Sequence, residues 1–446
     1  MLSARLSAAR AYLEFLKGNP LNTDPPMALE KPAERSLHQN LLLTLVRHQR
    51  LLETYLAQFS GRRPEKVDAP ARALAMLGLT QLRFLERIPH HAAVFETVAL
   101  AKPLGCGRAQ GFINAVLRQA QRSLVQTPTG ENHWPDETLL PLAVATSHPD
   151  WLVERWQKQY GEAATQAICQ ANNQPPTLTL RVDTRKTTPH ALISELAQTG
   201  MVAQPHPFWQ EAVQLEHGGN LFQSPVFVQG HCYAQDVPSQ IVMAWVAPHL
   251  PGRLLDACAA PGGKLTHLAA LRPQAPPMLA MEFVAGRMLR LKDNLSRLGT
   301  EALVLMGDAL KPPLAQESLD GVVLDVPCSA TGTIRKHPVK KWQRGLEDVL
   351  ANVPLQQAML QAAAGLLRVG GLLLYITCSL EQEENQAQVA TFLANNPSFS
   401  RVDWHSLPAP AALLVPAADY ISAEGDFVAL PNAGQMGLYA ALLQKT

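Results

Sequence analysis

Leu254-Leu255-Asp256-Ala257-Cys258-Ala259-Ala260-Pro261-Gly262-Gly263-Lys264 is the stretch that decides the fold of this 446-residue chain. It reads as a short apolar strand, then a turn of small residues, then a helix that we expect to continue through Leu271. Small residues in such a turn let the backbone approach a ligand closely at the carboxyl end of the strand. The stretch therefore predicts the first β–α unit of a cofactor-binding α/β domain.

The alternation of strand and helix continues on the C-terminal side of this unit. Apolar runs predict strands at 253–257, 279–282, 302–306, 321–324 and 372–377, and helical segments separate most of them. Strands that alternate with helices form parallel sheets that are covered on both faces. We predict a Rossmann-like C-terminal domain with a mostly parallel sheet.

The N-terminal part of the chain has a different periodicity. Its apolar residues recur at helical spacing over 8–16, 38–59, 70–86, 92–102 and 105–122, and runs of β-branched residues are few. Helices that follow one another closely without strands between them are typical of bundles. We predict an all-α bundle for this region.

Between the two regions the signals are mixed. A polar stretch at 126–132 is the best candidate for a linker, while 177–182 and 213–215 read as strands and 190–199 as a helix. We therefore expect three domains, namely a helical domain over 1–130, a small α/β linker domain over 148–230 and a catalytic domain over 231–446.

Composition excludes several classes of protein. The net charge is +1, with 17 basic and 13 acidic residues before residue 151 and 21 and 24 after it, so a uniformly basic surface is excluded. The start lacks the apolar run of a secretion signal, and the greasiest segment is too short to span a membrane. Six cysteines without a CxxC pair argue against disulfides or a zinc site. We expect a cytoplasmic protein with reduced thiols, no membrane association and no metal.

The turn at 256–264 narrows the choice of cofactor. An ATP-binding Walker A loop would need Gly at 258 and Ser or Thr at 265, where the chain has Cys258 and Leu265, and no GxGxxG dinucleotide fingerprint is present. Four acidic residues stand at successive strand ends: Asp256, Glu282, Asp308 and Asp325. One such acid usually caps the following helix. Four of them beside a small-residue turn favour a ligand site, and S-adenosylmethionine is the remaining cofactor class.

Two cysteines emerge at the same predicted edge of the sheet. Cys328 follows the strand that ends at Asp325, and Cys378 closes the strand at 372–377, and each is followed by Ser. A lone cysteine in apolar surroundings is normally a small core residue, which is the interpretation we give Cys106, Cys169 and Cys232. Adjacent parallel strands would bring the Cys328 and Cys378 thiols to the rim where ligands bind.

At this point the chain resembles a known family. The motifs Asp256–Lys264, Asp325–Ser329 and Thr377–Ser379 resemble those of the Sun-type RNA cytosine-5 methyltransferases. Further stretches are similar to the branch of that family that carries an N-terminal NusB-like RNA-binding domain and acts on 16S ribosomal RNA: Leu77–Leu82, Ile88–Val94, Phe112–Arg118, Ser147–Trp151 and Gln235–Gln240. The resemblance covers nearly the whole chain.

The resemblance implies a set of site residues. It implies S-adenosylmethionine as the cofactor, Cys378 as a nucleophile that adds to carbon 6 of cytosine, and Cys328 as the group that assists release by proton abstraction. Spacing alone leaves the two roles open, because the DNA cytosine-5 enzymes carry the nucleophile in the Pro-Cys motif. Asp325 could hold the methionine amine or protonate the cytosine edge. The implied cofactor contacts are Cys258, Ala259, Ala260, Pro261, Gly262, Gly263, Lys264, Glu282, Asp308 and Asp325.

A basic segment follows the Pro-Cys motif. Its five fixed positive charges, beside a Trp, predict a track for an RNA backbone: Arg335, Lys336, Lys340, Lys341 and Arg344. The competing interpretation is a solvated helix start. We expect a monomer with 16S ribosomal RNA as its partner. The alternatives are the same chemistry on transfer RNA or another ribosomal site, and a non-catalytic NusB-like RNA-binding or antitermination factor.

Overall fold

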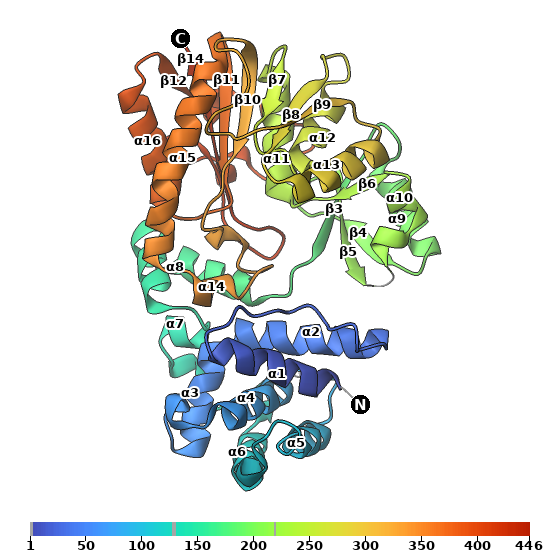
Figure 1. Cartoon of the computed structure of the whole chain (residues 1–446), viewed down its shortest axis with the longest axis vertical. Coiled ribbons are helices and arrows are strands. Elements are labelled where there is room, and N and C mark those ends of the chain that lie inside the picture. Colours follow the sequence, from blue (N-terminus) through green and yellow to red (C-terminus); the bar gives the residue numbers. More distant parts are fainter. Residues whose placement is uncertain (1–2, 127–130, 218–219) are drawn as a thin grey trace. The chain divides into compact units, whose positions relative to one another are not determined.

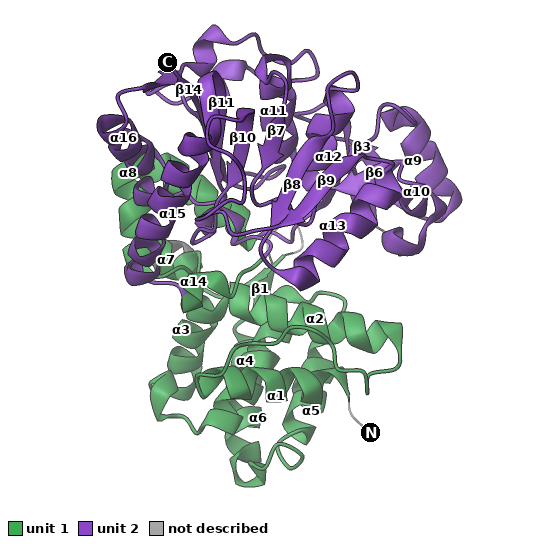
Figure 2. Ribbon diagram, turned by 45° about the horizontal axis from the view of Figure 1, so that its top comes forward, with its two compact units in different colours: residues 1–173, 337–343 green, residues 174–336, 344–446 purple. Residues whose placement is uncertain are grey.

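The computed structural model describes residues 3–126, 131–217 and 220–446. The chain forms two compact units, and Figure 2 shows them in different colours. One unit consists of residues 1–173 and 337–343, and the other of residues 174–336 and 344–446. This division places 337–343 with the helical unit, although the sequence lies inside the predicted catalytic domain. The predicted boundaries of the three domains stay a prediction, and the linker residues 127–130 lie outside the described part of the chain.

The first unit is a helical bundle, as predicted. Its helices are α1 (Ala4–Leu16), α2 (Pro32–Arg47), α3 (Gln49–Ser60), α4 (Ala69–Phe84), α5 (His90–Ala99), α6 (Gln110–Arg122), α7 (Leu142–Ala145), α8 (Asp150–Asn173) and α14 (Lys340–Gln343), with a short ribbon of β1 (Val125–Gln126) and β2 (Asn132–His133). Helix α4 is buried on almost every side from Ala71 to Leu82 and packs against α1, α2, α3, α5 and α6. A helix that is apolar all round belongs at the centre of a bundle.

One predicted helix of this unit was wrong. The segment 38–59 is two helices, because the backbone leaves helical geometry at His48 (φ −114°, ψ 19°) between α2 and α3. The His48 ring stacks on Phe84 with 3.9 Å between ring centroids. The apolar spacing continues on both sides of the break, so periodicity did not reveal it. Helix α2 consequently ends at Arg47, and its last backbone carbonyl oxygens need hydrogen-bond donors from outside the helix.

The second unit begins with a small antiparallel sheet of strand order β4-β5-β3-β6. Its strands are β3 (Leu178–Val182), β4 (Val202–Pro205), β5 (Ala212–His217) and β6 (Cys232–Ala234), covered by α9 (Pro189–Gln198) and α10 (Pro225–Val228). The predicted strands at 177–182 and 213–215 and the predicted helix at 190–199 are confirmed. Strands β4 and β6 were not predicted because each is too short to show an alternating pattern.

The main sheet has eight strands in the order β12-β14-β11-β10-β7-β8-β9, with β13 paired to β14. The five predicted strands are present and parallel: β7 (Leu254–Asp256), β8 (Met278–Glu282), β9 (Ala302–Met306), β10 (Leu319–Asp325) and β11 (Leu367–Thr377). The other three strands lie together at one side of the sheet: β12 (Phe399–Val402), β13 (Phe427–Ala429) and β14 (Leu438–Lys445). Strand β14 is antiparallel to β11. The prediction of a mostly parallel sheet is confirmed.

Successive residues of these strands belong to two different cores. Leu254 and Val323 pack under α11 (Val237–Val246), α12 (Gly263–Leu271) and α13 (Ala285–Leu298), while Leu255 and Val322 pack under α15 (Leu346–Leu366) and α16 (Gln386–Asn395). Figure 1 shows the two sets of helices on opposite sides of the sheet. Alternation is expected because consecutive side chains of a strand point to opposite faces.

The order of the strands fixes where a ligand can bind. From β7 the chain moves outward to β8 and β9, and then returns to place β10 on the other side of β7. Ligands of such sheets bind at the carboxyl ends of the strands where the order reverses. Here that point lies between Asp256 at the end of β7 and Asp325 at the end of β10. No helix among the described residues is both long enough and apolar enough to cross a membrane.

Candidate active site

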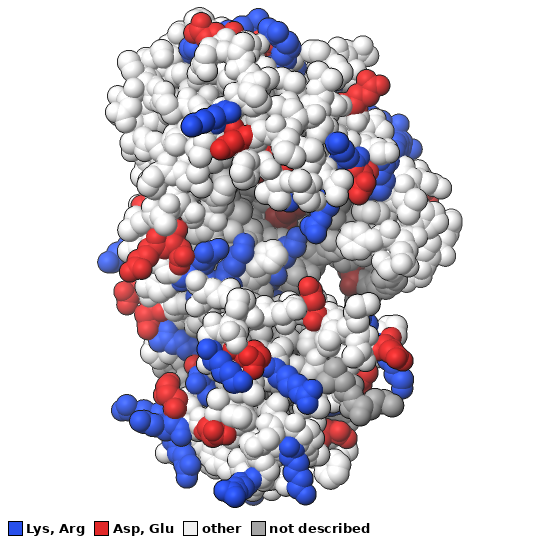
Figure 3. Space-filling view, viewed as in Figure 1, with Lys and Arg blue, Asp and Glu red and all other residues white. Residues whose placement is uncertain are grey.

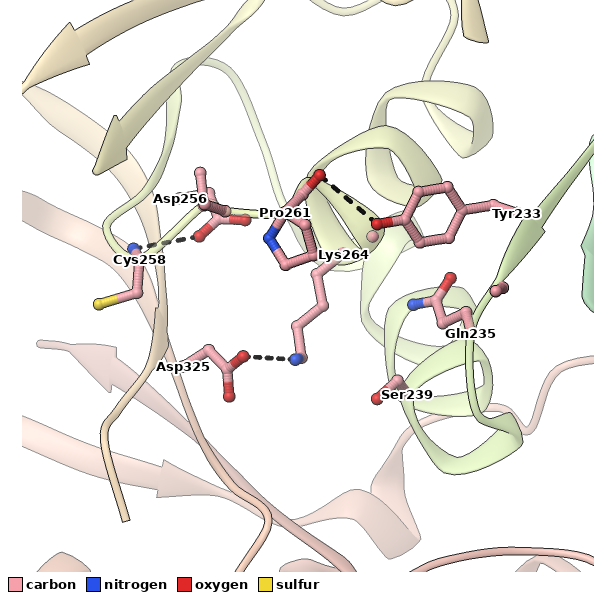
Figure 4. Close-up of a pocket in the computed structure, with 12 residues that line it drawn as sticks. Tyr233, Gln235, Ser239, Asp256, Cys258, Pro261, Lys264 and Asp325 are labelled. Carbon is pink, nitrogen blue, oxygen red and sulfur yellow. Dashed lines mark hydrogen bonds and ion pairs between the residues drawn. The ribbon is translucent and has the colours of Figure 1, made fainter. Parts of the chain in front are cut away.

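The small-residue turn forms one wall of a pocket at this reversal point. The pocket is lined by residues of the turn, of β6 and of the two strand ends, and Figure 4 shows the labelled side chains around it: Tyr233, Gln235, Ser239, Asp256, Cys258, Pro261, Lys264 and Asp325. Gly262 adopts φ +105°, a conformation that L side chains rarely adopt, and directly precedes α12. Ala259, Ala260 and Gly263 of the turn line the pocket, so little side chain stands between the backbone and the pocket.

Arg181 of the small sheet fixes the turn from behind. Its guanidinium is buried and donates to the carbonyl oxygen of Gly263 at 2.6 Å, to Thr266 Oγ1 at 2.9 Å and to Gln235 Oε1 at 2.7 Å. Three acceptors in a fixed fork hold the start of α12 and the pocket wall in one arrangement. The small sheet therefore supports the cofactor turn directly.

Lys264 and Asp325 form an ion pair inside the pocket. The Lys264 Nζ lies 2.6 Å from Asp325 Oδ2, and the pair joins the first turn of α12 to the end of β10 (Figure 4). The charges of Asp325, Asp256 and Cys378 together raise the pKa of Lys264 against the opposing effect of burial, which is the largest single influence. Lys264 is therefore a fixed positive charge beside the strand-end acids, and it favours an ionised Cys378.

Asp256 is the most strongly perturbed acid of the pocket. Its side chain is buried, and Oδ1 accepts a hydrogen bond from the Cys258 amide at 3.3 Å. Burial raises the pKa of Asp256 to about 7, and the charges of Asp325 and Glu282 act in the same direction, while Lys264 opposes them. A buried acid that is half protonated near neutral pH is suited to a cationic ligand.

Cys258 is unsuited to nucleophilic chemistry. Burial raises the pKa of its thiol to about 12, and the negative charges of Asp256, Asp325 and Glu282 add to this effect. A thiol that stays protonated at neutral pH is neither a nucleophile nor a metal ligand. Cys258 lines the pocket and stays a predicted cofactor contact.

The other two strand-end acids make local hydrogen bonds. Glu282 is buried and accepts from the Val284 amide at 2.9 Å, while half-buried Asp308 accepts from the Leu310 amide at 2.9 Å. Each carboxylate thus uses one oxygen in the way that the capping interpretation expects. The Arg287 guanidinium lies 3.7 Å from the other oxygen of Glu282.

The structure brings the two predicted cysteines into contact. The Sγ atoms of Cys328 and Cys378 lie 3.3 Å apart, beyond the ends of the adjacent parallel strands β10 and β11. The hydrogen bond to Cys378 raises the pKa of Cys328 well above its usual value, and burial and the charge of Glu384 add to the shift. The two sulfurs are within hydrogen-bond distance, and either of them can be the donor.

The backbone around Cys378 is fixed by a close approach of two glycines. The Gly332 amide donates to the Cys378 carbonyl oxygen at 3.0 Å, and the Gly437 amide donates to the Gly332 carbonyl oxygen at 2.8 Å. A Cβ atom on Gly332 would lie 2.8 Å from both the Cys378 and Gly437 carbonyl oxygens. Only glycine fits at 332, so the loop after Cys328 is locked onto the end of β11.

A buried polar network behind the cysteines was missed from the sequence. Ser329 and Ser379, the residues after the two cysteines, place their hydroxyl oxygens 3.1 Å apart. Both the amide and the hydroxyl of Ser329 donate to the fully buried Glu384. The paired Cys-Ser dipeptides were the available signal, because two polar residues at the ends of adjacent buried strands need partners.

Two residues of the predicted basic track are buried and cannot serve as exposed phosphate contacts. The Arg335 guanidinium donates to the carbonyl oxygens of Pro175, Asn432 and Ala433, at 2.8 to 3.1 Å, and is 5% exposed. Lys341 is 1% exposed, and its Nζ donates to the Arg47 carbonyl oxygen at 2.7 Å. The prediction that Arg335 and Lys341 contact RNA phosphates is therefore wrong, because their side-chain N–H groups are buried and donate to backbone carbonyl oxygens.

The other members of the track are accessible. Lys336 and Arg344 are exposed, with Arg344 3.4 Å from Asp348, and Lys340 is half-buried. On the face shown in Figure 3, basic side chains are interspersed with acidic ones rather than gathered in one patch. Lys336, Lys340 and Arg344 stay predicted RNA contacts.

This difference in burial leads to a testable expectation. Lys336→Ala combined with Arg344→Ala should lower the salt slope of RNA affinity, by about 0.7 for each phosphate of a single-stranded RNA that the variant no longer neutralises. Lys341→Ala should leave the salt slope unchanged. It should lower the free energy of unfolding by about 1–3 kcal/mol, because buried acceptors lose their hydrogen-bond donor. Salt titrations of binding and chemical denaturation of the same variants measure both quantities. A reduced slope for Lys341→Ala alone would contradict the assignment.

Comparison with known proteins matches three segments of the chain to family models. Residues 243–443 match the family model described as 16S rRNA methyltransferase RsmB/F, residues 148–221 match the ferredoxin-like domain of RsmF/B-like methyltransferases, and residues 2–122 match the NusB family. The ribosomal RNA small subunit methyltransferase B of Sodalis glossinidius (strain morsitans) is 36% identical over 451 residues, which cover 99% of this chain and 98% of the relative. The chain belongs to the RsmB/F family of 16S rRNA methyltransferases.

A second relative supports this family assignment, and a solved structure shares the fold. The protein of the same name from Escherichia coli O1:K1 / APEC is 35% identical over 95% of this chain and 96% of its own length. The crystal structure of PH0851 has the same fold, with a TM-score of 0.74, 24% identity and coverage of 100% of this chain and 99% of that one. The predicted fold class, a NusB-like bundle followed by a small α/β domain and a Rossmann-like methyltransferase domain, is confirmed.

Proposed function

We propose that this protein transfers a methyl group from S-adenosylmethionine to carbon 5 of a specific cytosine in 16S ribosomal RNA, through a covalent cysteine–C6 intermediate. The observation that carries the proposal is the contact of two thiols, 3.3 Å apart, at the sheet edge that also holds the pocket of the small-residue turn. Membership of the RsmB/F family supports methyl transfer to ribosomal RNA.

The pocket residues fit S-adenosylmethionine, which supplies an electrophilic methyl group when bound. Asp256 and Asp325 line the pocket and would face the cationic methionine end of the cofactor. Buried Glu282 at the end of β8 is suited to the ribose hydroxyls, and Asp308 beyond β9 is suited to an adenine amino group. The small residues of the turn that line the pocket, Ala259, Ala260 and Gly263, would let the cofactor lie against the backbone.

Cys378 is proposed as the nucleophile and Cys328 as the group that assists release. Carbon 5 of cytosine is a poor nucleophile, and addition of a thiolate to carbon 6 makes it enamine-like. We take the Cys328 thiol as the donor across the 3.3 Å contact, and the positive charge of Lys264 favours an ionised Cys378, so both groups favour the Cys378 thiolate. These two interactions support the assignment that spacing alone left open.

Adduct formation would also change the state of Cys328. The main cause of its raised pKa is the hydrogen bond to Cys378, and this cause is removed once the Cys378 sulfur becomes a neutral thioether. Cys328 can then lose its proton to solvent and accept the proton that leaves carbon 5 after methylation. The electron pair of that C–H bond restores the ring double bond as the Cys378 sulfur departs as a thiolate. One proton is released overall for each methyl group transferred.

Bisulfite mapping of ribosomal RNA tests the proposed function. In a strain that lacks this gene, one 5-methylcytosine of the small-subunit RNA should disappear and should return when the intact gene is restored. Restoration with Cys378→Ala should fail to return it. If a methylated cytosine disappears from transfer RNA instead, the substrate is transfer RNA and not 16S ribosomal RNA. If no cytosine changes, the result contradicts methyl transfer to carbon 5 of cytosine.

The raised pKa of Asp256 predicts a pH-dependent affinity for the cofactor. In the free protein Asp256 takes up a proton as the pH falls below about 7, whereas a cationic ligand favours the ionised carboxylate. S-Adenosylmethionine affinity should therefore fall by up to about tenfold for each pH unit below 7 and be level above it. Calorimetric titrations across pH 7 measure this, and Asp256→Asn should give a flat profile. The same dependence in Asp256→Asn would assign it to another group.

A further inference from the structure

Glu384 is a buried acid that the chemistry described above does not use. It lies in the short 3₁₀ turn Gln382–Glu384, six residues after Cys378, and its side chain is 0% exposed. Its Oε1 accepts from the Ser329 amide at 2.8 Å and from Asn352 Nδ2 at 2.9 Å, and its Oε2 accepts from Ser329 Oγ. Gln356 Nε2 adds a fourth donor at 3.2 Å.

The donors of Glu384 come from both sides of the cysteine pair. Ser329 directly follows Cys328, while Asn352 and Gln356 belong to α15, and Gln356 also donates to the Pro327 carbonyl oxygen at 2.8 Å. The carboxylate therefore holds residues 327 and 329, on either side of Cys328, against helix α15. A carboxylate that accepts only and has four donors around it is fully satisfied as an anion.

The charged groups around the two thiols are arranged asymmetrically. Glu384 stands behind Cys328, where its negative charge disfavours a second anion, and the Tyr375 hydroxyl at this side donates to the Glu384 carbonyl oxygen at 2.7 Å. Lys264, which is paired with Asp325 at 2.6 Å, interacts favourably with an ionised Cys378. Two sulfurs 3.3 Å apart share one proton most stably when the negative charge rests on the sulfur that the cation stabilises and not on the one that the carboxylate opposes.

We propose that Glu384 is a positioning residue that fixes the Cys328 turn against Cys378 and keeps the shared proton of the two thiols on Cys328. The inference rests on the proposed covalent role of Cys378 and deepens it. It explains why two chemically identical side chains on adjacent strands take different roles. Glu384 acts through Cys328 and touches neither the RNA nor the cofactor in this scheme.

The test measures which sulfur ionises first, in the full-length protein without RNA. Iodoacetamide labelling at a series of pH values, read by mass spectrometry of the separate cysteine peptides, gives a midpoint for Cys328 and for Cys378. In the unmodified protein Cys378 should react at the lower pH. In Glu384→Gln, which keeps the shape and removes the charge, labelling of Cys328 at neutral pH should rise at least about tenfold, equivalent to one pKa unit.

Matched variants separate charge from structure. Glu383 is the half-buried neighbour of Glu384, and Glu383→Gln removes an equal charge one residue away. This variant should leave the labelling midpoints of Cys328 and Cys378 unchanged. Ser329→Ala removes one donor but keeps the Glu384 charge, so the Cys328 midpoint should not fall. Cofactor binding and thermal unfolding report whether each variant is folded. If Glu384→Gln fails to fold, the labelling midpoints of Cys328 and Cys378 in the unmodified protein and in Ser329→Ala still test the inference.

Three results would overturn the inference: Cys328 reacting before Cys378 in the unmodified protein, unchanged selectivity in folded Glu384→Gln, or a Cys328 midpoint that falls in Ser329→Ala. None of these depends on RNA. A failure of the proposed substrate in the bisulfite experiment therefore stays distinguishable from a failure of this inference.

Discussion

Cys328→Ala should accumulate a covalent complex between the protein and its RNA, whereas Cys378→Ala should form none and lose all methyl transfer. The asymmetry follows from the proposed roles, because addition to carbon 6 needs only the Cys378 thiolate, while release needs a proton acceptor at carbon 5. With Cys328 replaced, the methylated adduct forms and has no partner 3.3 Å away to complete the elimination. We expect methyl transfer to stop after a single turnover in that variant.

Denaturing gel electrophoresis with labelled RNA measures the adduct directly. The double variant Cys328→Ala/Cys378→Ala should show no adduct, which ties the complex in the single variant to Cys378. Cys106→Ala serves as a matched control, since this buried cysteine belongs to the helical bundle. An adduct in Cys378→Ala and none in Cys328→Ala would reverse the two roles.

Lys264→Met should lower the single-turnover rate of methyl transfer by about 10²–10³. The substitution keeps the length of the side chain but removes the positive charge that favours an ionised Cys378 and pairs with Asp325 at 2.6 Å. Without that charge the Cys378 thiolate is less favourable, so a smaller fraction of the protein is reactive at neutral pH. The rising limb of the rate against pH should therefore move to higher pH.

Two other variants test the electrostatic origin of that effect. Lys264→Arg keeps the charge and should hold the position of the pH limb even if its larger head group lowers the rate. Lys292→Met removes a positive charge from an exposed position on α13 and should alter neither rate nor profile. A Lys264→Met protein with a lower rate but an unmoved pH limb would show that Lys264 acts on substrate position and not on the thiolate.

The central part of the fold could be predicted because its signals are local. Each parallel strand of the sheet is a short apolar run bounded by turn residues, and β7, β8 and β9 lie within one or two residues of their expected ends. Strand β14 was missed although it pairs with β11, because the alanine-containing run Leu438–Leu443 suits a helix equally well. Its strand geometry comes from its neighbours.

The site could be predicted as far as strand order brings residues together. Adjacent strand ends were enough to expect Cys328 and Cys378 at the same rim, where the structure has them in contact, and acids at successive strand ends beside a small-residue turn were enough to expect Asp256 and Asp325 at one site. Glu384 could not be found in this way, because an acidic run normally indicates exposed surface. Its burial depends on donors from Ser329, Asn352 and Gln356, which lie 28 to 55 positions earlier.

In the basic track the sequence predicted exposed contact residues, and some of them are buried. A run of positive charges indicates exposed surface in most proteins, and for Lys336 and Arg344 this is what the structure has. Lys341 departs from it because its ammonium meets a carbonyl oxygen at the end of α2, 294 positions earlier. No pattern within the segment itself distinguishes a lysine that binds phosphate from one that binds the end of a helix.

That long-range contact has a consequence for biosynthesis. The last carbonyls of α2, those of Val46 and Arg47, receive their donors from Trp342 and Lys341, which belong to the helical unit although they follow most of the parallel sheet in the chain. At translation rates of about 5–20 residues per second, the ribosome needs on the order of 10–30 s to proceed from residue 173 to residue 343. During this interval the nascent helical unit lacks its final segment. It is completed only after strands β7 to β10 have been synthesised, so its folding cannot finish in simple N-to-C order.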